Sequence, residues 1–376
     1  MKILIAPNSF KNSLSSVEVV QIIHNELGET SSFELLQFPL SDGGDGFIDV
    51  IDFFSNGKFE KKYYELDFAN KVFNCPVLID KSNGVFYIES AEAIGLKKIS
   101  SDNLNPLKIN SAPLGMLIKK IIEDFSKNEL KEIIIGIGGT ATIDFGLGAL
   151  SELGFEFLNE NNQPINPIPE NFHLIKGFIQ SDYLKIPLIK CVVDVNTKLL
   201  GENNAIEIYG PQKGADKEKI NFIESGIKKV IEILQAKGFS IDKFELNGAG
   251  GGIAAGFNIF LNSEIIKARD FILKELMRKI SLTESDYIIT CEGKFDTQSF
   301  EGKITGEIIK AFNHTVKRIF IICGLAEKNI ITKLPPNVEV IQISEFFNSL
   351  DDSLRNSSLG IRKSIPKIIK QILSDI

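Results

Sequence analysis

Short apolar runs alternate with amphipathic segments along most of this chain, and that alternation is typical of an α/β protein. Apolar runs predict strands at residues 2–7, 33–40, 131–139, 186–196, 286–293, 318–324 and 338–344. Segments with a helical apolar period predict helices at residues 15–27, 46–57, 112–127 and 215–238. The predicted fold class is therefore α/β.

The first predicted helix has recognisable start and stop residues. Ser15 and Glu18 form an S-x-x-E capping box, which satisfies backbone N–H groups at a helix N-terminus. Gly28 is expected to end the helix, because glycine readily adopts the backbone conformation found after the last turn.

A change of pattern after residue 60 indicates a second domain. Residues 71–90 predict a β-hairpin around KSNG, because Asn-Gly suits a tight primed turn. Alternation of strands and helices then resumes. We expect residues 66–284 to form an inserted α/β domain, and residues 1–65 and 285–376 to form a discontinuous one whose strands share one sheet.

Length and composition fit two globular domains. The chain has 376 residues, of which 43% are hydrophobic and 24% are charged. A net charge of −7 argues against nucleic acid as a partner, because phosphate binding needs a basic surface. No apolar run approaches the roughly 18 residues of a membrane span, and Pro7 interrupts the opening run too early for a signal peptide. We expect a cytoplasmic protein that binds neither nucleic acid nor membrane.

The cysteines and histidines indicate neither a disulfide nor a zinc site. The cysteines are widely separated and form no CxxC pair: Cys75, Cys191, Cys291 and Cys323. Because most of them lie in or just after apolar runs, we expect reduced, buried thiols. The three histidines are isolated from one another and match no zinc-ligand spacing.

Four predicted strands are followed by small or acidic residues. The loops begin at Gly138 and Gly139, at Asp194, at Glu292, and at Asp42 in the sequence PLSDGGDGF. In open α/β sheets, ligands bind beyond the carboxyl ends of strands, so these loops are expected to converge on one site. For the Asp/Gly loop a simple tight turn is the alternative, since both residue types favour turns.

Two glycine-rich tracts have no standard motif. Residues 136–148 (GIGGTATIDFGLG) run from a strand towards a helix, where backbone N–H groups can face an anion. Glycine for close packing is the alternative there. Residues 247–256 (NGAGGGIAAG) form the second tract. In GPQKGA (210–215), local sequence predicts a solvated turn around Lys213.

Polar side chains are densest in CEGKFDTQSFEGK, residues 291–303, which supplies Glu292, Lys294, Asp296, Gln298, Ser299 and Lys303. The segment after the first strand adds Ser9, Lys11 and Ser13. Lysines and hydroxyls suit phosphate oxygens, while carboxylates suit Mg²⁺ and the proton of a hydroxyl. These residue types predict a phosphoryl-transfer site on an α/β scaffold.

Taken together, the motifs resemble the type-1 glycerate kinase family nearly end to end. They are ILIAPNSFKNSLSS, FPLSDGGDGF, IGIGGTATIDFGLGAL, VVDVNTKLLG, YGPQKGA, AGGGIAAG and CEGKFDTQSFEGK. The resemblance implies a kinase that transfers the ATP γ-phosphate to a hydroxyl of D-glycerate, usually giving 2-phosphoglycerate, with Mg²⁺. It also implies two α/β domains, one of them built from both chain ends, with the active site in the cleft between them.

The chain departs from the family's usual residues at several motif positions. Asn8 and Asn12 replace Asp and Gly, Asp45 and Phe47 replace Glu and Thr, Ile143 and Phe145 replace Asn and Gly, Asn196 and Thr197 are swapped, and Lys294 replaces Arg. Two other functions stay open on this basis. One is a kinase for another small hydroxy acid, and the other is a non-catalytic protein that binds a sugar-derived acid.

The expected catalytic residues are Asp42, Asp194 and Lys11, and the two aspartates are also the expected metal ligands. The expected substrate- and phosphate-binding residues are Ser9, Gly43, Gly44, Gly138, Gly139, Thr140, Thr142, Glu292, Asp296, Gln298 and Lys303. The expected ligands are D-glycerate, ATP and Mg²⁺, and a homodimer is one arrangement considered.

Overall fold

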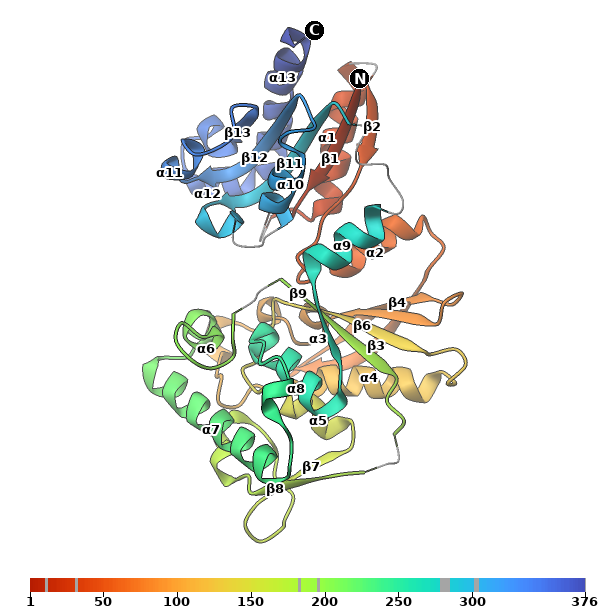
Figure 1. The fold of residues 1–376 in the computed structure, drawn as a ribbon, viewed down its shortest axis with the longest axis vertical. Helices are drawn as coiled ribbons and strands as arrows, with labels where there is room; N and C mark the ends of the chain where they lie inside the picture. Colours follow the sequence, from red (N-terminus) through yellow and green to blue (C-terminus); the bar gives the residue numbers. More distant parts are fainter. Residues whose placement is uncertain are drawn as a thin grey trace. The chain divides into compact units, whose positions relative to one another are not determined.

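The computed structural model describes residues 1–10, 13–30, 33–181, 184–194, 197–277, 285–300 and 304–375. Its contacts divide the chain into two compact units (Figure 1). The first unit comprises Met1–Asp42, Asp49–Phe54 and Ala268–Ile376, and the second comprises Gly43–Ile48 and Ser55–Lys267.

These divisions differ from the boundaries expected near residues 65 and 285. Residue 65 lies inside strand β3 (Glu60–Phe68), which pairs along its whole length with β4 (Lys71–Asp80), so both strands belong to the second unit. Helix α9 (Ala268–Met277) lies before the other expected boundary, but its contacts assign it to the first unit. The cleft expected between two domains stays a prediction.

The first unit contains a five-stranded sheet in the order β13-β12-β11-β1-β2. Its strands are β1 (Lys2–Pro7), β2 (Glu34–Gln37), β11 (Tyr287–Phe295), β12 (Arg318–Ala326) and β13 (Val338–Gln342). All neighbours are parallel, and β1 pairs directly with β11, Ile3 opposite Tyr287. Strands from the two ends of the chain therefore share one sheet, as the sequence predicted.

Helices cover both faces of this sheet. They are α1 (Ser16–Thr30), α2 (Phe47–Ser55), of which Asp49–Phe54 belongs to this unit, α9, α10 (Ile304–Phe312), α11 (Lys328–Ile331), α12 (Leu350–Arg355) and α13 (Ser357–Ser374). Helices α1 and α13 share a core with Ile3 and Ile5 of β1. Helix α10 shares the opposite core with Leu4 and Ala6. Because α1 follows β1 and α10 follows β11, the direction of winding reverses between these two neighbouring strands, and such reversals form ligand crevices.

The second unit contains a six-stranded sheet in the order β10-β9-β6-β5-β4-β3. Its remaining strands are β5 (Val85–Glu89), β6 (Glu132–Ile137), β9 (Leu188–Val193) and β10 (Glu264–Lys267). These four are parallel, whereas β3 and β4 are antiparallel additions. Strands β4 and β5 form the hairpin predicted around KSNG, with Asp80 opposite Val85. A separate two-stranded sheet pairs β7 (Phe155–Leu158) with β8 (Gly177–Gln180).

The helices of the second unit are α3 (Ser90–Ile94), α4 (Ala112–Asp124), α5 (Leu147–Glu152), α6 (Ala205–Tyr209), α7 (Lys217–Ala236) and α8 (Ile253–Leu261). Their buried side chains join one large core with the sheet, in which Leu117, Ile135, Ile227 and Phe257 are fully excluded from solvent. Helix α7 confirms the long amphipathic helix that the sequence predicted.

Helix α1 confirms its predicted start but not its predicted end. The backbone N–H of Ser15 donates to Glu18 Oε2 at 2.7 Å, and the N–H of Glu18 donates to Ser15 Oγ at 3.2 Å. The helix continues through Gly28 to Thr30, so Gly28 is an interior position. Glycine permits a helix end without requiring one.

All four cysteines are buried and unpaired, as expected from their apolar surroundings. Burial raises the pKa of the Cys191 thiol to about 12. Over the described residues, no helix is both long enough and apolar enough to cross a membrane.

The close contact of α4 with α5 generates a stability prediction. A Cβ atom on Gly115 would lie 2.3 Å from the carbonyl oxygen of Ala149, so Gly115→Ala must push the two helices apart. We expect the free energy of unfolding to fall by about 1–3 kcal/mol, measured by urea denaturation followed by circular dichroism. Gly28→Ala is the helical control, since no atom lies within 4 Å of its added methyl, and it should stabilise by about 0.5–1 kcal/mol. Equal midpoints for the two variants would contradict the prediction.

Candidate functional site

In the first unit, Asn8 connects three loops at the carboxyl end of the sheet. Its backbone N–H donates to the carbonyl of Cys291 at 3.0 Å, which joins β1 to β11. Its side-chain Nδ2 donates to Asp42 Oδ2 at 2.7 Å, and its Oδ1 accepts the N–H of Ser9 at 2.8 Å. Asn8 is only 4% exposed. The expected residues Ser9 and Asp42 therefore lie together where the winding reverses.

Two further expected residues, Glu292 and Asp296, lie at the same edge of the sheet and are buried. Ser299, which is fully buried, donates from Oγ to Glu292 Oε2 at 2.8 Å. The same Oγ accepts the backbone N–H of Asp296 at 3.1 Å, and Lys294 pairs with the Asp296 carboxylate at 3.0 Å. One serine hydroxyl thus links the Glu292 carboxylate, inside β11, to the turn that begins at Asp296.

In the second unit, the glycines of the Asp/Gly loop lie against the ends of β6 and β9. A Cβ atom on Gly43, whose φ is +79°, would lie 2.9 Å from the carbonyl oxygen of Val192. A Cβ atom on Gly138 would lie 2.6 Å from the Cα of Gly44. Gly138 therefore serves close packing, the alternative that the sequence left open for residues 136–148, and Gly43 of the Asp/Gly loop packs in the same way. Phosphate binding by their backbone stays a prediction.

Two consecutive residues, Glu89 at the end of β5 and Ser90 after it, bind the Asp/Gly loop and the glycine-rich loop that follows β6. Glu89 accepts the N–H of Gly46 at 3.1 Å and the N–H of Ile48 at 3.3 Å. Ser90 donates from Oγ to the carbonyl of Gly138 at 3.0 Å and accepts the N–H of the same residue at 3.1 Å. Glu89 and Ser90 therefore fix the Asp/Gly loop and the first glycine-rich loop relative to one strand.

Glu89 is 3% exposed, and it is not among the site residues expected from the sequence. Burial, followed by repulsion from Glu92, raises the pKa of Glu89 to about 8, with Asp45 acting in the same direction and the two backbone N–H donors opposing. The sequence did contain a signal for it. Glu89 is an acidic residue at the end of an apolar strand, and the expected site residues Asp194 and Glu292 likewise follow apolar runs.

The solvated turn predicted around Lys213 is wrong. Lys213 ends the short 3-10 helix η4 (Pro211–Lys213) and is 5% exposed. Its Nζ donates to Thr140 Oγ1 at 3.2 Å and to the carbonyl of Thr142 at 2.9 Å. Burial lowers the pKa of Lys213 to about 8, while Asp144 opposes the shift. Local sequence could not reveal this, because the burying residues come from distant parts of the chain.

The second glycine-rich tract (residues 247–256) accepts a hydrogen bond from the first (residues 136–148). Thr142 donates from Oγ1 to the carbonyl of Gly250 at 3.4 Å, so its hydroxyl has a structural contact. Asp144, which is fully buried, accepts the backbone N–H of Ser111 at 2.7 Å and its hydroxyl at 2.6 Å. Asp144 therefore joins the glycine-rich loop to the start of α4.

The remaining expected residues are distributed as follows. Asp194 follows β9 in the second unit and is exposed, whereas Asp42 belongs to the first unit. Lys11 and Lys303 lie outside the described residues, as does the side chain of Gln298. Over the described ranges, no group of three or more His, Cys, Asp or Glu side chains is placed to hold a metal ion.

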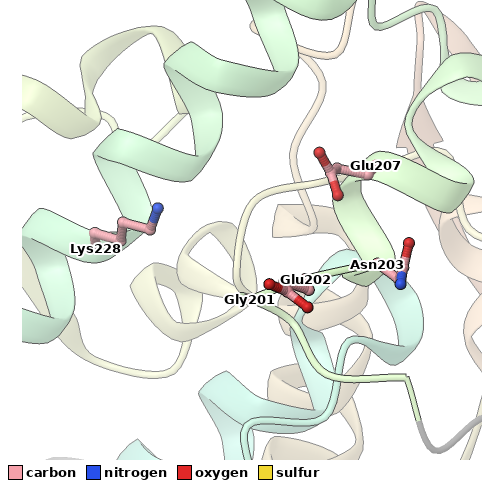
Figure 2. Close-up of a pocket in the computed structure, with 5 residues that line it drawn as sticks. All are labelled: Gly201, Glu202, Asn203, Glu207 and Lys228. Atoms are coloured by element: carbon pink, nitrogen blue, oxygen red, sulfur yellow. The ribbon is translucent and has the colours of Figure 1, made fainter.

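A surface hollow in the second unit contains none of the expected residues. Figure 2 shows its lining, which is Gly201, Glu202, Asn203, Glu207 and Lys228. Glu207 pairs with Lys217 at 3.0 Å, and Lys228 pairs with Glu224 at 3.6 Å. Because none of the expected residues lines it, the hollow is not the candidate site.

Comparison with known proteins identifies relatives over the full length of the chain. The sequence matches the glycerate kinase family over residues 3–373. It is 29% identical over 381 residues to a glycerate kinase from Neisseria meningitidis serogroup B, covering 98% of each chain. It is 28% identical over 364 residues to glycerate 2-kinase from Escherichia coli K12, covering 95% of this chain and 94% of the relative.

The fold agrees with the sequence match. A crystal structure from Salmonella typhimurium LT2, provisionally assigned as glycerate kinase 2, aligns with a TM-score of 0.78 at 25% identity. The alignment covers 100% of this chain and 99% of that one. The match over residues 3–373 confirms what the motifs predicted: the chain belongs to the glycerate kinase family.

Proposed function

We propose that this enzyme transfers the γ-phosphate of ATP to a hydroxyl of D-glycerate and releases 2-phosphoglycerate. The observation that carries the proposal is that Asn8 bonds to Ser9, to Asp42 and to the carbonyl of Cys291, the residue before Glu292, in a chain of this family. The name of the Escherichia coli relative supports the 2-position of the product.

The acidic residues suit Mg²⁺ by their chemistry. Mg²⁺ prefers oxygen ligands and is usually held by one or two carboxylates together with phosphate oxygens and water. Asp42 and Asp194 would supply those carboxylates, so a cage of three protein acids is not required. When bound, Mg²⁺ would neutralise charge on the transferred phosphoryl group.

The residues of this chain would divide the remaining work between positioning and proton transfer. Asp42, with one oxygen fixed by Asn8, would orient the acceptor hydroxyl or take its proton. Ser9 and Lys11, with Gly138 to Thr142, would bind phosphate oxygens. A cytoplasmic location and a homodimer stay predictions.

A direct assay tests the proposed function. ATP consumption should depend on both D-glycerate and Mg²⁺, and EDTA should abolish it. The product should be consumed by enolase without a mutase, because enolase acts on 2-phosphoglycerate and not on 3-phosphoglycerate. Faster ATP use with another hydroxy acid would favour the alternative kinase. Glycerate binding without ATP consumption would favour the non-catalytic protein.

Substitution of the two aspartates tests their roles. Asp42→Asn and Asp194→Asn keep side-chain size but remove the charge that would hold metal or accept a proton. Each should lower kcat by roughly 10²-fold or more, with the melting temperature close to that of the wild type. If Asp42→Asn keeps nearly full activity and only melts earlier, the Asp/Gly loop is a structural turn.

Substitution of Glu89 tests whether the Asp/Gly loop must be held in place. In Glu89→Gln, one of the two backbone N–H donors must face an amide N–H, so the segment Gly43–Ile48 should shift. Because misplacement by about 1 Å can cost up to roughly 10²-fold in rate, we expect kcat to fall at least about tenfold. Steady-state kinetics at saturating substrates measures this effect.

Asp80 provides a matched control in the same unit. It is 5% exposed and accepts the backbone N–H groups of Ser82 and Asn83 in the β4–β5 turn. Asp80→Asn should lower stability while leaving kcat unchanged, since this turn lies at the opposite end of β5 from Glu89. Similar losses of kcat in Asp80→Asn and Glu89→Gln would indicate a general stability effect.

A further inference from the structure

Lys213 is a buried cation without an ion-pair partner among the described residues. At 5% exposure it is the one buried lysine in that part of the chain. Both acceptors of its Nζ, Thr140 Oγ1 and the Thr142 carbonyl, are neutral. Removing a charge from water is unfavourable unless an opposite charge compensates it. In the described part of the chain, only neutral acceptors bond to this buried positive charge.

Asp144 does not provide that compensation directly. Its carboxylate is already bonded to the N–H and hydroxyl of Ser111 and to the N–H of Gly148. It favours the charged form of Lys213 through space, but no hydrogen bond joins the two side chains in the described structure. An ammonium has three donors, and acceptors in the described part of the chain account for two of them.

The position of Lys213 matches that of a ligand-binding group. The loop that it contacts follows β6, at the carboxyl edge of the parallel strands where ligands bind in α/β sheets. Ser90 fixes the same loop through both backbone groups of Gly138. The ammonium is thus held on a rigid support, which reduces the entropy lost on binding.

We propose that Lys213 binds an anionic oxygen of the substrates, either the carboxylate of glycerate or a phosphate oxygen of ATP. The proposal rests on the proposed function and assigns a cation to the loops at the carboxyl ends of the second unit's strands. A lysine ammonium is a point charge that suits both kinds of anion. The competing explanation is a clamp for residues 140–142, for which neutral N–H donors would be sufficient.

Two variants separate charge from clamping. Lys213→Met removes both charge and donors at similar length, whereas Lys213→Gln keeps N–H donors without the charge. Binding of D-glycerate alone, Mg-ATP alone and inorganic phosphate alone to the full-length protein is measured by isothermal titration calorimetry. We expect each variant to lower the binding affinity for one of the two substrates at least tenfold. Loss of D-glycerate binding identifies the carboxylate, and loss of Mg-ATP and phosphate binding identifies the phosphate.

The melting temperature supplies a second readout. Removal of a buried charge that only neutral groups contact should leave the melting temperature of Lys213→Met unchanged or raised, whereas loss of a clamp should lower it. Lys229→Met is the control, because Lys229 also donates to a backbone carbonyl, that of His173, at 3.0 Å from α7. It should bind all three ligands as the wild type does.

Two results would overturn the proposal. One is binding of all three ligands by Lys213→Met and Lys213→Gln within twofold of the wild type. The other is an equal loss of affinity for D-glycerate and for Mg-ATP together with a lower melting temperature, which would identify a clamp. Failure of the proposed function is distinguishable, because the wild type itself would then not phosphorylate D-glycerate.

Discussion

In the second unit, the Asp/Gly loop and the glycine-rich loop after β6 approach each other so closely that neither can carry side chains at the contact. The arrangement of residues beyond the carboxyl ends of the strands depends on this close approach. The backbone of Gly43 and Gly44 lies directly on the end of β6, and a Cβ atom on Gly136 would lie 2.5 Å from the carbonyl oxygen of Gly43. Side chains at these positions would separate the loops. Glu89 and Ser90 can each hold one loop only because both loops pass within hydrogen-bonding distance of the end of β5.

Buried charge is concentrated around this region and around the end of β11. Of the buried ionisable residues that the structure describes, Glu89, Asp144, Lys213, Glu292 and Asp296 lie in or contact segments at the carboxyl ends of parallel strands, whereas Asp80 caps the β4–β5 turn at the other end of β5. Each such group opposes folding unless hydrogen bonds or ligands compensate it. A structure selected for stability alone would have little reason to bury such groups at the strand ends of each unit, and perturbed ionisable groups are frequent at functional sites.

Two departures from the family's usual residues have a structural explanation. Phe145 has φ of +55°, in the left-handed region that favours glycine, the residue more common there in the family. That conformation costs a non-glycine residue roughly 1–2 kcal/mol, but Phe145 is fully buried near Phe260, and burial of such a side chain contributes about 1.5–3 kcal/mol. Phe47 is fully buried beside Gly136, so it packs in the core of this chain.

Local sequence determined helix α7, the Ser15–Glu18 capping box and the β4–β5 hairpin, because their causes lie within a few residues of one another. It also selected Asp42 and Glu292, since an acid after an apolar strand is visible locally. Tertiary structure alone decided the burial of Lys213, whose partner Thr140 is 73 residues away. It likewise decided that the glycines pack backbone against backbone, because the atoms that exclude a side chain come from other strands.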